Sequence, residues 1–399
     1  MKILLVNKYL YPVGGAEEYV FSIGKELTKL GNEVQYFGID SKVKQVANAS
    51  GIYGKCYETN PFLKLFPSSM IYSRSAKAAM DKLLDSFHPD IIHLNNINFQ
   101  LTPSIIYSAK ERRIPVVWTL HDPQLVCPNH RLFNEGKKEV CTKCLGGDFT
   151  QCIKNRCFKG SLIKSIIGCR ESQRYHKKDT IYNYVSAFIS PSRFLQKLTS
   201  SFIPENKVHV LPNYSSFSYE EEIEKKDYFL YFGRLSQEKG IYTLLHAIPK
   251  KAKIVIAGNG PLENDVLAAS KENPRIQFVG FKKGKEFQEL ISHALCSIYP
   301  SEWYENCPLS ILESLSLRTP VIGSDIGGIP ELIEDEKTGL LFKPGDSEDL
   351  RAKMERILTD HSLSTSLNSN LEKYNPQKAS EYIKKLLNLY ACSIKESKE

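Results

Sequence analysis

Along most of the chain, short apolar runs alternate with segments in which apolar residues recur every three or four positions. The apolar runs of the first half have the length of buried strands, and they lie at 2–7, 34–37, 90–94, 115–120, 185–190 and 208–211. The amphipathic segments between them predict helices at 16–30, 72–87, 103–112 and 192–202, with a long helix after residue 160. Strands that alternate with helices in this way are typical of a parallel sheet in an α/β domain.

The same alternation begins again in the second half of the chain, after a polar and charged stretch at 215–226 that has the composition of a linker. Strands are predicted at 228–232, 254–257, 276–279, 294–299 and 321–323, and helices at 241–248, 285–294, 308–317, 346–358 and 376–394. Two such series predict two doubly wound, Rossmann-like domains that face each other across a cleft. Ligands of such sheets bind at the carboxyl ends of the strands.

The break in the pattern sets the expected domain boundaries. We assign residues 1–213 to an N-terminal domain, 214–375 to a C-terminal domain and 376–399 to a final helix. A length of 399 residues is long for one hydrophobic core and agrees with two. Residues at about 122–160 lack the alternation and contain several cysteines, so they predict an insertion in the first domain.

Composition and charge indicate the location and the classes of partner of the protein more than its function. The formal net charge of +8 is a mild basic excess that fits an anionic substrate, an anionic membrane surface or nucleic acid. No apolar run approaches the roughly 20 residues of a membrane span, and the first residues lack the pattern of a signal peptide. We therefore expect a cytoplasmic protein, whose ten cysteines serve as thiols or metal ligands rather than in disulfides.

The stretch from Tyr299 to Leu332 holds the strongest candidate chemistry. Glu305 follows a predicted strand, and Glu313 comes after seven intervening residues, inside a helix that Pro308 is suited to begin. The first backbone N–H groups of a helix attract anions. Carboxylates can bind hydroxyl groups and the N–H groups can bind phosphate, so the two together suit a phosphorylated sugar. The alternative is that Glu305 and Glu313 are two solvated acids on the surface.

A second candidate loop follows the first strand of the second domain. It runs from Gly233 through Arg234 to Lys239. The planar guanidinium and the compact ammonium together suit a diphosphate, and they would stabilise negative charge on a departing phosphate. Two solvated cations on a loop are the alternative.

Three further motifs also follow predicted strands. Gly14 and Gly15 open the first helix and would let backbone approach a phosphate, or they form only a tight turn. His121 ends the strand at 115–120 and would hydrogen-bond a sugar hydroxyl or phosphate, or cap the sheet. Gly327 and Gly328 again precede a helix, and a turn without a ligand explains them nearly as well.

The insertion contains a possible metal site. Cys141 and Cys144 have the spacing of half a tetrahedral zinc site, which Cys152 and Cys157 would complete, with Cys127 as a possible substitute. Such a zinc would be structural, because four thiolates leave no open position for catalysis. Buried reduced thiols or a disulfide pair are the alternatives. The basic and partly apolar segment 154–164 is suited to an anionic membrane surface, or forms a solvated helix face.

The chain resembles the retaining glycosyltransferases of family 4, which have the GT-B fold. The resemblance rests on five motifs in the same order along the chain: Gly14-Gly15-Ala16-Glu17, His121, the Arg234/Lys239 loop, the Glu305/Glu313 pair and Gly327-Gly328. The resemblance covers nearly the whole chain and implies that the first domain binds the acceptor and the second a nucleotide-sugar donor. It also implies that the last helix crosses back onto the first domain.

The resemblance further implies a role for each matching residue. Arg234 and Lys239, with Gly233 in the same loop, would hold the diphosphate, assisted by backbone at Gly14 and Gly15 and by amides near Leu309 and Ser310. Glu313 would bind ribose hydroxyls, and Glu305 and His121 would contact the donor sugar. The implied reaction is front-side attack by an acceptor hydroxyl beside the leaving diphosphate, with no cofactor or metal required for catalysis.

The most concrete prediction is a bacterial enzyme of surface-polysaccharide synthesis that acts on a glycan or lipid-linked acceptor, in the cytoplasm or peripherally on the inner face of the cell membrane. A sugar-nucleotide epimerase or glycan phosphorylase of the same fold is the first alternative. A zinc-containing nucleic-acid-binding protein is the second, and the small net charge and the lack of aromatic residues among the basic ones argue against it.

Overall fold

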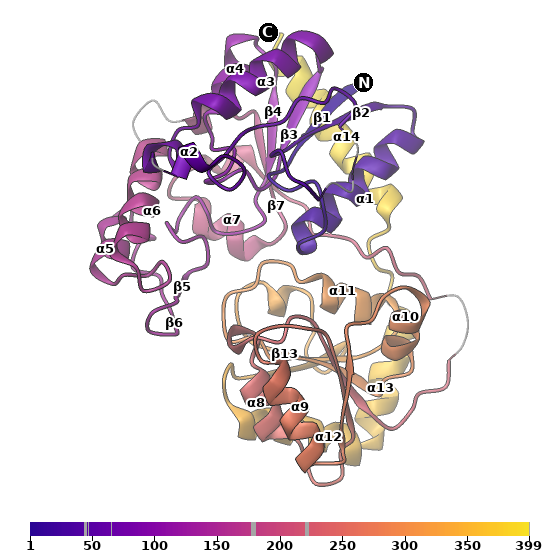
Figure 1. Cartoon of the computed structure of the whole chain (residues 1–399). Helices are drawn as coiled ribbons and strands as arrows, with labels where there is room; N and C mark the ends of the chain where they lie inside the picture. The colour runs from indigo at the N-terminus through magenta and orange to yellow at the C-terminus, as the bar shows by residue number, and fades with distance from the viewer. Residues whose placement is uncertain (44–45, 47, 65, 177–180, 220–222, 399) are drawn as a thin grey trace. The chain divides into compact units, whose positions relative to one another are not determined.

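The computed structural model describes residues 1–43, 46, 48–64, 66–176, 181–219 and 223–398 (Figure 1). The chain divides into two compact units. Unit 1 comprises Met1–Pro212 together with Ala379–Glu399, and unit 2 comprises Asn213–Lys378. Within the described residues, no helix is both long enough and apolar enough to cross a bilayer.

Unit 1 is built on a six-stranded, all-parallel sheet with the order β2-β1-β3-β4-β7-β8. Its strands are β1 (Lys2–Val6), β2 (Glu33–Phe37), β3 (Ile91–Leu94), β4 (Val116–Thr119), β7 (Ala187–Ser190) and β8 (Val208–Val210). The three strands β3, β4 and β7 are buried along their whole length. Such continuous burial is expected where helices cover both faces of a parallel sheet.

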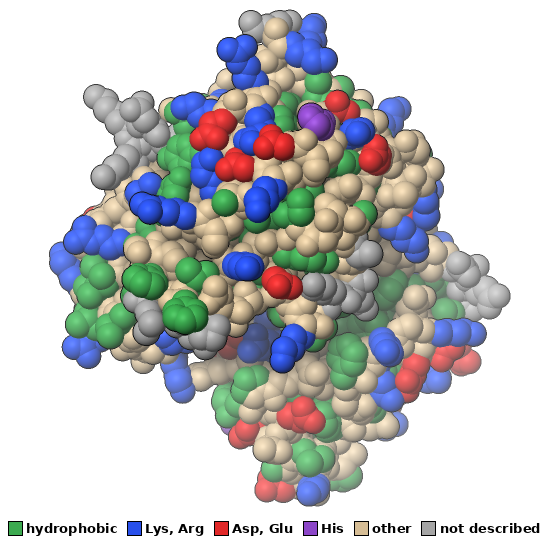
Figure 2. All heavy atoms as spheres, turned by 45° about the horizontal axis from the view of Figure 1, so that its top comes forward, with side chains coloured by type: hydrophobic (Ala, Val, Ile, Leu, Met, Phe, Trp, Pro, Cys, Tyr) green, Lys and Arg blue, Asp and Glu red, His purple; other side chains and the backbone are tan. Residues whose placement is uncertain are grey.

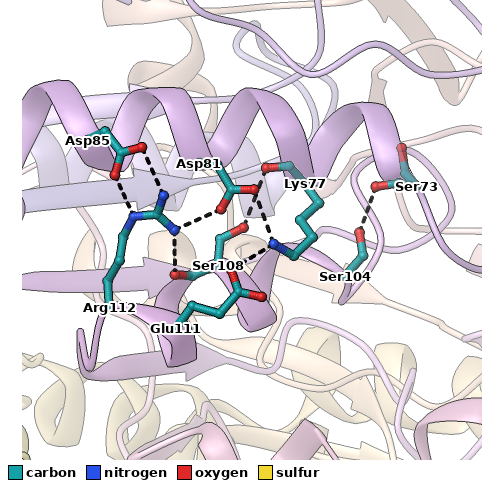
Figure 3. A network of polar contacts seen from close by, with 8 residues as sticks. All are labelled: Ser73, Lys77, Asp81, Asp85, Ser104, Ser108, Glu111 and Arg112. Atoms are coloured by element: carbon teal, nitrogen blue, oxygen red, sulfur yellow. Dashed lines mark hydrogen bonds and ion pairs between the residues drawn. The ribbon is translucent and has the colours of Figure 1, made fainter.

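The main helices of unit 1 are α1 (Gly15–Lys29), α3 (Arg74–Phe87), α4 (Ile105–Glu111), α6 (Leu162–Tyr175) and α7 (Arg193–Thr199). A polar network joins α3 to α4 and the residue after it (Figure 3). Arg112 donates to both carboxylate oxygens of Asp85, over 2.7 and 2.9 Å, and to Asp81 over 2.8 Å. Lys77 bridges Asp81 and Glu111. The bidentate geometry fixes the orientation of the two helices more than an isolated surface ion pair would.

The last helix of the chain, α14 (Ala379–Glu396), belongs to unit 1 and packs beside α1 and β4. Tyr382 and Tyr390 are fully buried. The hydroxyls of Tyr382 and Tyr19 lie 2.6 Å apart, and the hydroxyl of Tyr390 lies 2.6 Å from Nδ1 of His93 on β3. Thr119 completes the network, since its hydroxyl is 2.7 Å from Nε2 of His93. The final helix is therefore part of the unit 1 core.

The buried His93 predicts an acid-sensitive unit 1. Burial, together with the smaller effect of the nearby His121, lowers the pKa of His93 from 6.5 to about 3. The unfolded chain binds a proton at His93 below about pH 6.5 and the folded chain does not, so stability falls as the pH drops from 6.5 towards 3. Between pH 7.5 and 5 this one imidazole is expected to cost roughly 2 kcal/mol of unfolding free energy.

The measurement is urea unfolding followed by the fluorescence of Trp118, which lies in β4 of unit 1, in a chain whose other tryptophan is replaced (Trp303→Phe). A His93→Gln variant should lose the roughly 2 kcal/mol that this imidazole contributes and keep the share of the buried His121, whose pKa is lowered as well, whereas His209→Gln, which alters an exposed histidine of β8, should keep the whole dependence. The same slope in the wild type and in His93→Gln would contradict the prediction.

Unit 2 is a second six-stranded parallel sheet, with the order β11-β10-β9-β12-β13-β14. Its strands are β9 (Phe229–Phe232), β10 (Ile254–Ala257), β11 (Ile276–Gly280), β12 (Cys296–Tyr299), β13 (Val321–Ser324) and β14 (Gly339–Phe342). The order corresponds to 3-2-1-4-5-6, in which the direction of winding reverses between β9 and β12. Ligands of such sheets bind at the carboxyl ends of the strands beside this reversal.

Helices cover both faces of the unit 2 sheet. They are α8 (Ile241–Ala247), α9 (Glu263–Glu272), α10 (Gly284–Ser292), α11 (Leu309–Ser316), α12 (Ser347–Thr359) and α13 (His361–Glu372). Alternate residues of β9 enter different cores: Phe229 and Tyr231 pack with α8, α9 and α12, whereas Leu230 and Phe232 pack with α10. This division follows from the two-residue period of a strand.

The prediction of two doubly wound α/β domains with parallel sheets is confirmed, and most predicted elements are found within a few residues of their expected ends. Several elements were not predicted: strand β14, helix α13, the short helix α5 (Thr150–Lys154) and the two-stranded hairpin of β5 (Phe133–Asn134) and β6 (Glu139–Val140). The predicted linker forms no helix or strand where it is described, and its residues 220–222 lie outside the described residues.

Candidate active site

The loops after β9 and β12 meet at the reversal point of the unit 2 sheet. The first ends in a short 3₁₀ turn, Gln237–Lys239, and the second runs from Tyr299 to Glu305. Nζ of Lys239 lies 2.5 Å from Oε1 of Glu305 and 3.1 Å from the hydroxyl of Tyr299. The structure therefore brings together two of the predicted site residues, which are 66 positions apart in sequence.

Glu305 is held in its charged form. Burial alone would raise the pKa of Glu305, but the charge of Lys239 and hydrogen bonds from Lys239, Trp303 and Ser301 outweigh burial, so the pKa lies below its ordinary value. Trp303 Nε1 and Ser301 Oγ donate to the same oxygen, Oε1, over 2.6 and 3.0 Å. Within the described residues Oε2 accepts no hydrogen bond, so this oxygen remains able to accept from a ligand hydroxyl.

Arg234 differs from Lys239 in its surroundings. It is exposed, and its backbone carbonyl accepts a hydrogen bond from Tyr231 over 2.8 Å. Its guanidinium forms no ion pair or hydrogen bond with any residue that the structure describes. A planar cation without a protein partner, directly after a strand of such a sheet, is suited to bind a phosphate.

Two glycines allow the three loops at this edge to approach closely. Gly240 has φ +71°, and a Cβ there would lie 1.8 Å from the carbonyl oxygen of Pro300. Gly258, with φ +142°, would place a Cβ 1.9 Å from the carbonyl oxygen of Gly233. Any larger residue at either position would push the loop of Arg234 and Lys239 away from its neighbours.

Helix α11 contributes its first turn and Glu313. Pro308 is its N-cap and forms no side-chain cap, and the N–H groups of Leu309 and Ser310 have no hydrogen-bond acceptor among the described residues. The first N–H groups of a helix have no partner within it and carry partial positive charge. Glu313 is half-buried, and its charge is among the causes that raise the pKa of Tyr299. The carboxylate thus acts on the tyrosine that also contacts Lys239.

Gly327 and Gly328 support the Glu305 loop. The N–H of Gly328 donates to the carbonyl oxygen of Glu305 over 2.8 Å, and a Cβ on Gly327 would lie 2.5 Å from the same oxygen. Gly327 has φ +63°, which favours glycine. The alternative of a structural turn therefore accounts for this motif.

The predicted residues of unit 1 lie at a different sheet. His121 follows β4, and its Nε2 donates to Oδ1 of Asn95 over 2.9 Å, with the ring of Tyr19 at 5.0 Å. Burial lowers the pKa of His121 to about 3. The imidazole is thus neutral at physiological pH and is suited to hydrogen bonding rather than to supplying charge.

Gly14 and Gly15 are exposed at the start of α1, as expected. Gly14 is the N-cap, with extended backbone and no side-chain cap. The neighbouring Glu17 is buried and accepts a hydrogen bond from Asn7 over 3.0 Å, and burial raises the pKa of its carboxyl. The buried acid beside the glycine pair is the main polar feature at this end of unit 1.

The prediction of a structural zinc site is not supported. Cys144, Cys152 and Cys157 pack into a small core with Phe149 and Cys169, and Cys141 lies at its edge. Cys127 donates instead to Asn129 over 2.9 Å. All these thiols are free, and among the residues that the structure describes no group of three or more His, Cys, Asp or Glu side chains could hold a metal ion.

The physical reason is that these thiols pack and hydrogen-bond as core residues. The Cys152 thiol hydrogen-bonds Cys157, which raises the pKa of Cys152 and lowers that of Cys157. Spacing predicted that the cysteines would lie close together, and it did not distinguish four ligands from a thiol-rich core. The alternative of buried reduced thiols describes what is found.

Sequence reasoning missed the side chains that surround Lys239. Tyr299 and Trp303 place their rings 5.4 and 5.5 Å from its ammonium, and Ser301 binds Glu305. These three residues lie in the stretch that already contained Glu305. The density of aromatic and hydroxyl residues between a strand and that acid was the signal available in the sequence.

Comparison with known proteins gives consistent matches for both units. Residues 216–378 match the family model of glycosyl transferases group 1, and residues 13–145 match that of glycosyltransferase family 4. An uncharacterized glycosyltransferase of Methanocaldococcus jannaschii is 24% identical over 99% of this chain and 99% of that protein. N-acetyl-alpha-D-glucosaminyl L-malate synthase of Bacillus anthracis is 24% identical over 88% of this chain and 87% of its own length.

Solved structures agree in fold. The crystal structure of the Anabaena protein HepE in complex with UDP-glucose has a TM-score of 0.64 and 17% sequence identity, and the match covers 99% of this chain and all of HepE (100%). At this identity the likeness concerns the fold.

Proposed function

The chain belongs to the GT-B glycosyltransferases of family 4 type, and from this premise we propose that it moves a sugar from a nucleotide-sugar donor to an acceptor hydroxyl with retention of the anomeric configuration. The observation that carries the proposal is the joining of Lys239 and Glu305 at the reversal point of the unit 2 sheet, beside the unpartnered guanidinium of Arg234. Cations and a hydroxyl-binding carboxylate at one sheet edge fit a sugar carried on a diphosphate.

Lys239 can bind a phosphate of the nucleotide-sugar while it keeps its hydrogen bonds to the protein. An ammonium has three N–H groups that can donate hydrogen bonds, and two of those of Lys239 bind Glu305 and Tyr299. One donor is left for a phosphate oxygen. Arg234 supplies a second, planar set of donors, and the N–H groups of Leu309 and Ser310 supply neutral ones. These groups would hold the diphosphate as negative charge develops on it.

The carboxylates would bind hydroxyl groups. Oε2 of Glu305 is suited to the donor sugar, and Glu313 to the ribose, with both groups acting as acceptors. A nucleotide-sugar donor is supported by the solved structures of HepE, which are described as complexes with UDP and with UDP-glucose.

The proposed reaction is a front-side substitution. The bond between the anomeric carbon and the diphosphate oxygen breaks, the acceptor oxygen bonds to the same face of that carbon, and the acceptor proton passes to the leaving diphosphate oxygen. Arg234 and Lys239 stabilise the charge on the leaving group, so the protein supplies positioning and electrostatics. No side chain needs to accept the proton, because the leaving diphosphate oxygen takes it.

We propose that unit 1 binds the acceptor, a glycan or a lipid-linked sugar of surface-polysaccharide synthesis. The neutral His121, held by Asn95, would hydrogen-bond a sugar hydroxyl. A structural likeness supports the acceptor class: a mutant of S. aureus TarM, with a TM-score of 0.65, was solved in complex with fondaparinux, alpha-GlcNAc-glycerol and UDP.

The function is tested by thermal unfolding of the chain with a panel of UDP-, GDP- and ADP-sugars. The true donor at about 100 times its Kd is expected to stabilise unit 2 by roughly 2.7 kcal/mol, or roughly 5–10 °C in Tm. An Arg234→Ala variant should lose most of this shift, and Lys337→Ala, in an exposed ion pair with Glu334, should keep it. No shift with any nucleotide-sugar would refute the proposal.

Incubation of the identified donor without acceptor separates the enzyme classes. A transferase leaves the donor largely intact, whereas an epimerase of the same fold consumes it, and a phosphorylase acts only with inorganic phosphate and a glycan.

A further inference from the structure

Unit 1 exposes large hydrophobic side chains in two segments outside its core. On the first two turns of α6, Leu162, Ile163 and Ile166 are 45%, 68% and 38% exposed. In and after the short helix α2 (Pro61–Lys64), Phe62 and Phe66 are 75% and 58% exposed. Residues 146–215, which include α6, lie outside both matched family models.

The elements that carry the two segments are in contact, and the side-chain contacts between them lie at the Arg174–Tyr175 end of α6. The 3₁₀ turn Pro67–Met70, directly after Phe66, packs against both α2 and α6. Beyond it, the hydroxyl of Tyr175 on α6 donates to the carbonyl of Ile71, and the guanidinium of Arg174 lies 4.6 Å from the ring of Tyr72. Figure 2 shows hydrophobic side chains gathered beside lysine and arginine side chains at the left edge of the molecule, the side on which Figure 1 places α5 and α6.

The charges that the two segments themselves carry are all positive, and beside them Oε2 of Glu135 accepts a hydrogen bond from the backbone N–H of Lys159 over 2.7 Å. Residues 149–170 and 59–80 contain no Asp or Glu. The exposed cations of the first segment are Lys154, Arg156, Lys159, Lys164 and Arg170. None of them forms an ion pair with another described residue. The exposed acid that precedes them, Asp148, accepts hydrogen bonds from Thr150 and Gln151 at the start of α5.

We propose that this surface, formed by Phe62, Phe66, Leu162, Ile163, Ile166 and the five cations, docks unit 1 on an anionic lipid bilayer. Apolar side chains that protrude among unpaired cations are complementary to acyl chains beneath negatively charged headgroups. A protein partner would need acidic residues positioned around its apolar contact surface, whereas an anionic bilayer carries negative charge over its whole surface. The exposed phenylalanines suit the boundary between headgroups and acyl chains.

The test is flotation of the full chain with vesicles of phosphatidylcholine alone or mixed with phosphatidylglycerol. Binding is expected to the mixed vesicles and not to the neutral ones, and it should weaken as salt is raised. Ile163→Ser/Ile166→Ser should bind at least tenfold more weakly. Lys159→Gln, Lys164→Gln and Arg170→Gln should each reduce binding about fivefold, and together multiplicatively.

The matched control is Phe281→Ser, which removes a 66% exposed aromatic ring from unit 2 and should bind vesicles like the wild type. Unchanged Trp118 fluorescence would establish that the unit 1 variants remain folded. Binding to neither vesicle, equal binding to both, or wild-type binding by Ile163→Ser/Ile166→Ser would each overturn the proposal. No donor or acceptor is present in the assay, so its failure would leave the proposed transferase function standing.

Discussion

Replacing Lys239 by Ala is expected to lower kcat about 100- to 1000-fold, because it removes a charged donor from the position where negative charge develops on the leaving diphosphate. Donor binding should weaken less than turnover, since Arg234 and the amides of Leu309 and Ser310 remain. The measurement is steady-state release of the nucleoside diphosphate with the donor identified by thermal unfolding. Near-normal turnover would contradict the assigned role.

The loss of Lys239 also leaves the largely buried Glu305 carboxylate without its cation, so stability has to be measured beside activity. The side chain of Glu305 is only 12% exposed, and an unpaired charge at such a position destabilises the fold. Lys239→Ala/Glu305→Gln removes both charges and should restore the Tm without restoring kcat. Lys337→Ala deletes an exposed lysine of unit 2 and should leave both unchanged. Recovery of activity in the double variant would assign Lys239 a structural role only.

Deletion of residues 379–399 is expected to unfold unit 1 while unit 2 stays folded. Helix α14 buries Tyr382, Ile383, Leu386 and Tyr390 almost completely in unit 1. At roughly 1.5–3 kcal/mol for each buried side chain, their loss removes roughly 6–12 kcal/mol, which is comparable to the whole stability of a typical domain. The hydroxyl network around His93 would also lose a partner.

Limited proteolysis with mass spectrometry measures this outcome. The truncated chain should be cleaved throughout residues 1–212, while a fragment close to 213–378 persists. Removal of only 397–399, whose described residues are exposed, is the control and should leave the pattern of the full chain. A protease-resistant unit 1 in the chain that lacks 379–399 would contradict the prediction, and Tyr390→Ala should show the same loss in milder form.

Periodicity accounts for most of what could be predicted. Strands such as β1, β4 and β9 are unbroken apolar runs because both of their faces are covered, and helices such as α1 carry one apolar stripe, so both types of element can be read from the sequence. The loops after the strands, with Arg234, Lys239 and Glu305, were recognisable for the same reason. Helix α13 was missed because it is rich in serine, which weakens its apolar stripe, whereas strand β14 was missed although it is as long as β4 and β9.

The sequence by itself determined the two parallel-sheet units, the position of each candidate residue after a strand, and the presence of cysteines near one another in the insertion. Only the tertiary structure decided that β9 and β12 are neighbours, which joins Lys239 to Glu305. It also decided that Tyr299 and Trp303 lie over the ammonium and that the cysteines pack into a thiol-rich core. The physical reason is that hydrophobic periodicity reports which face of an element is buried, whereas the order of strands in a sheet and the direction of each side chain arise from packing between segments far apart in the chain.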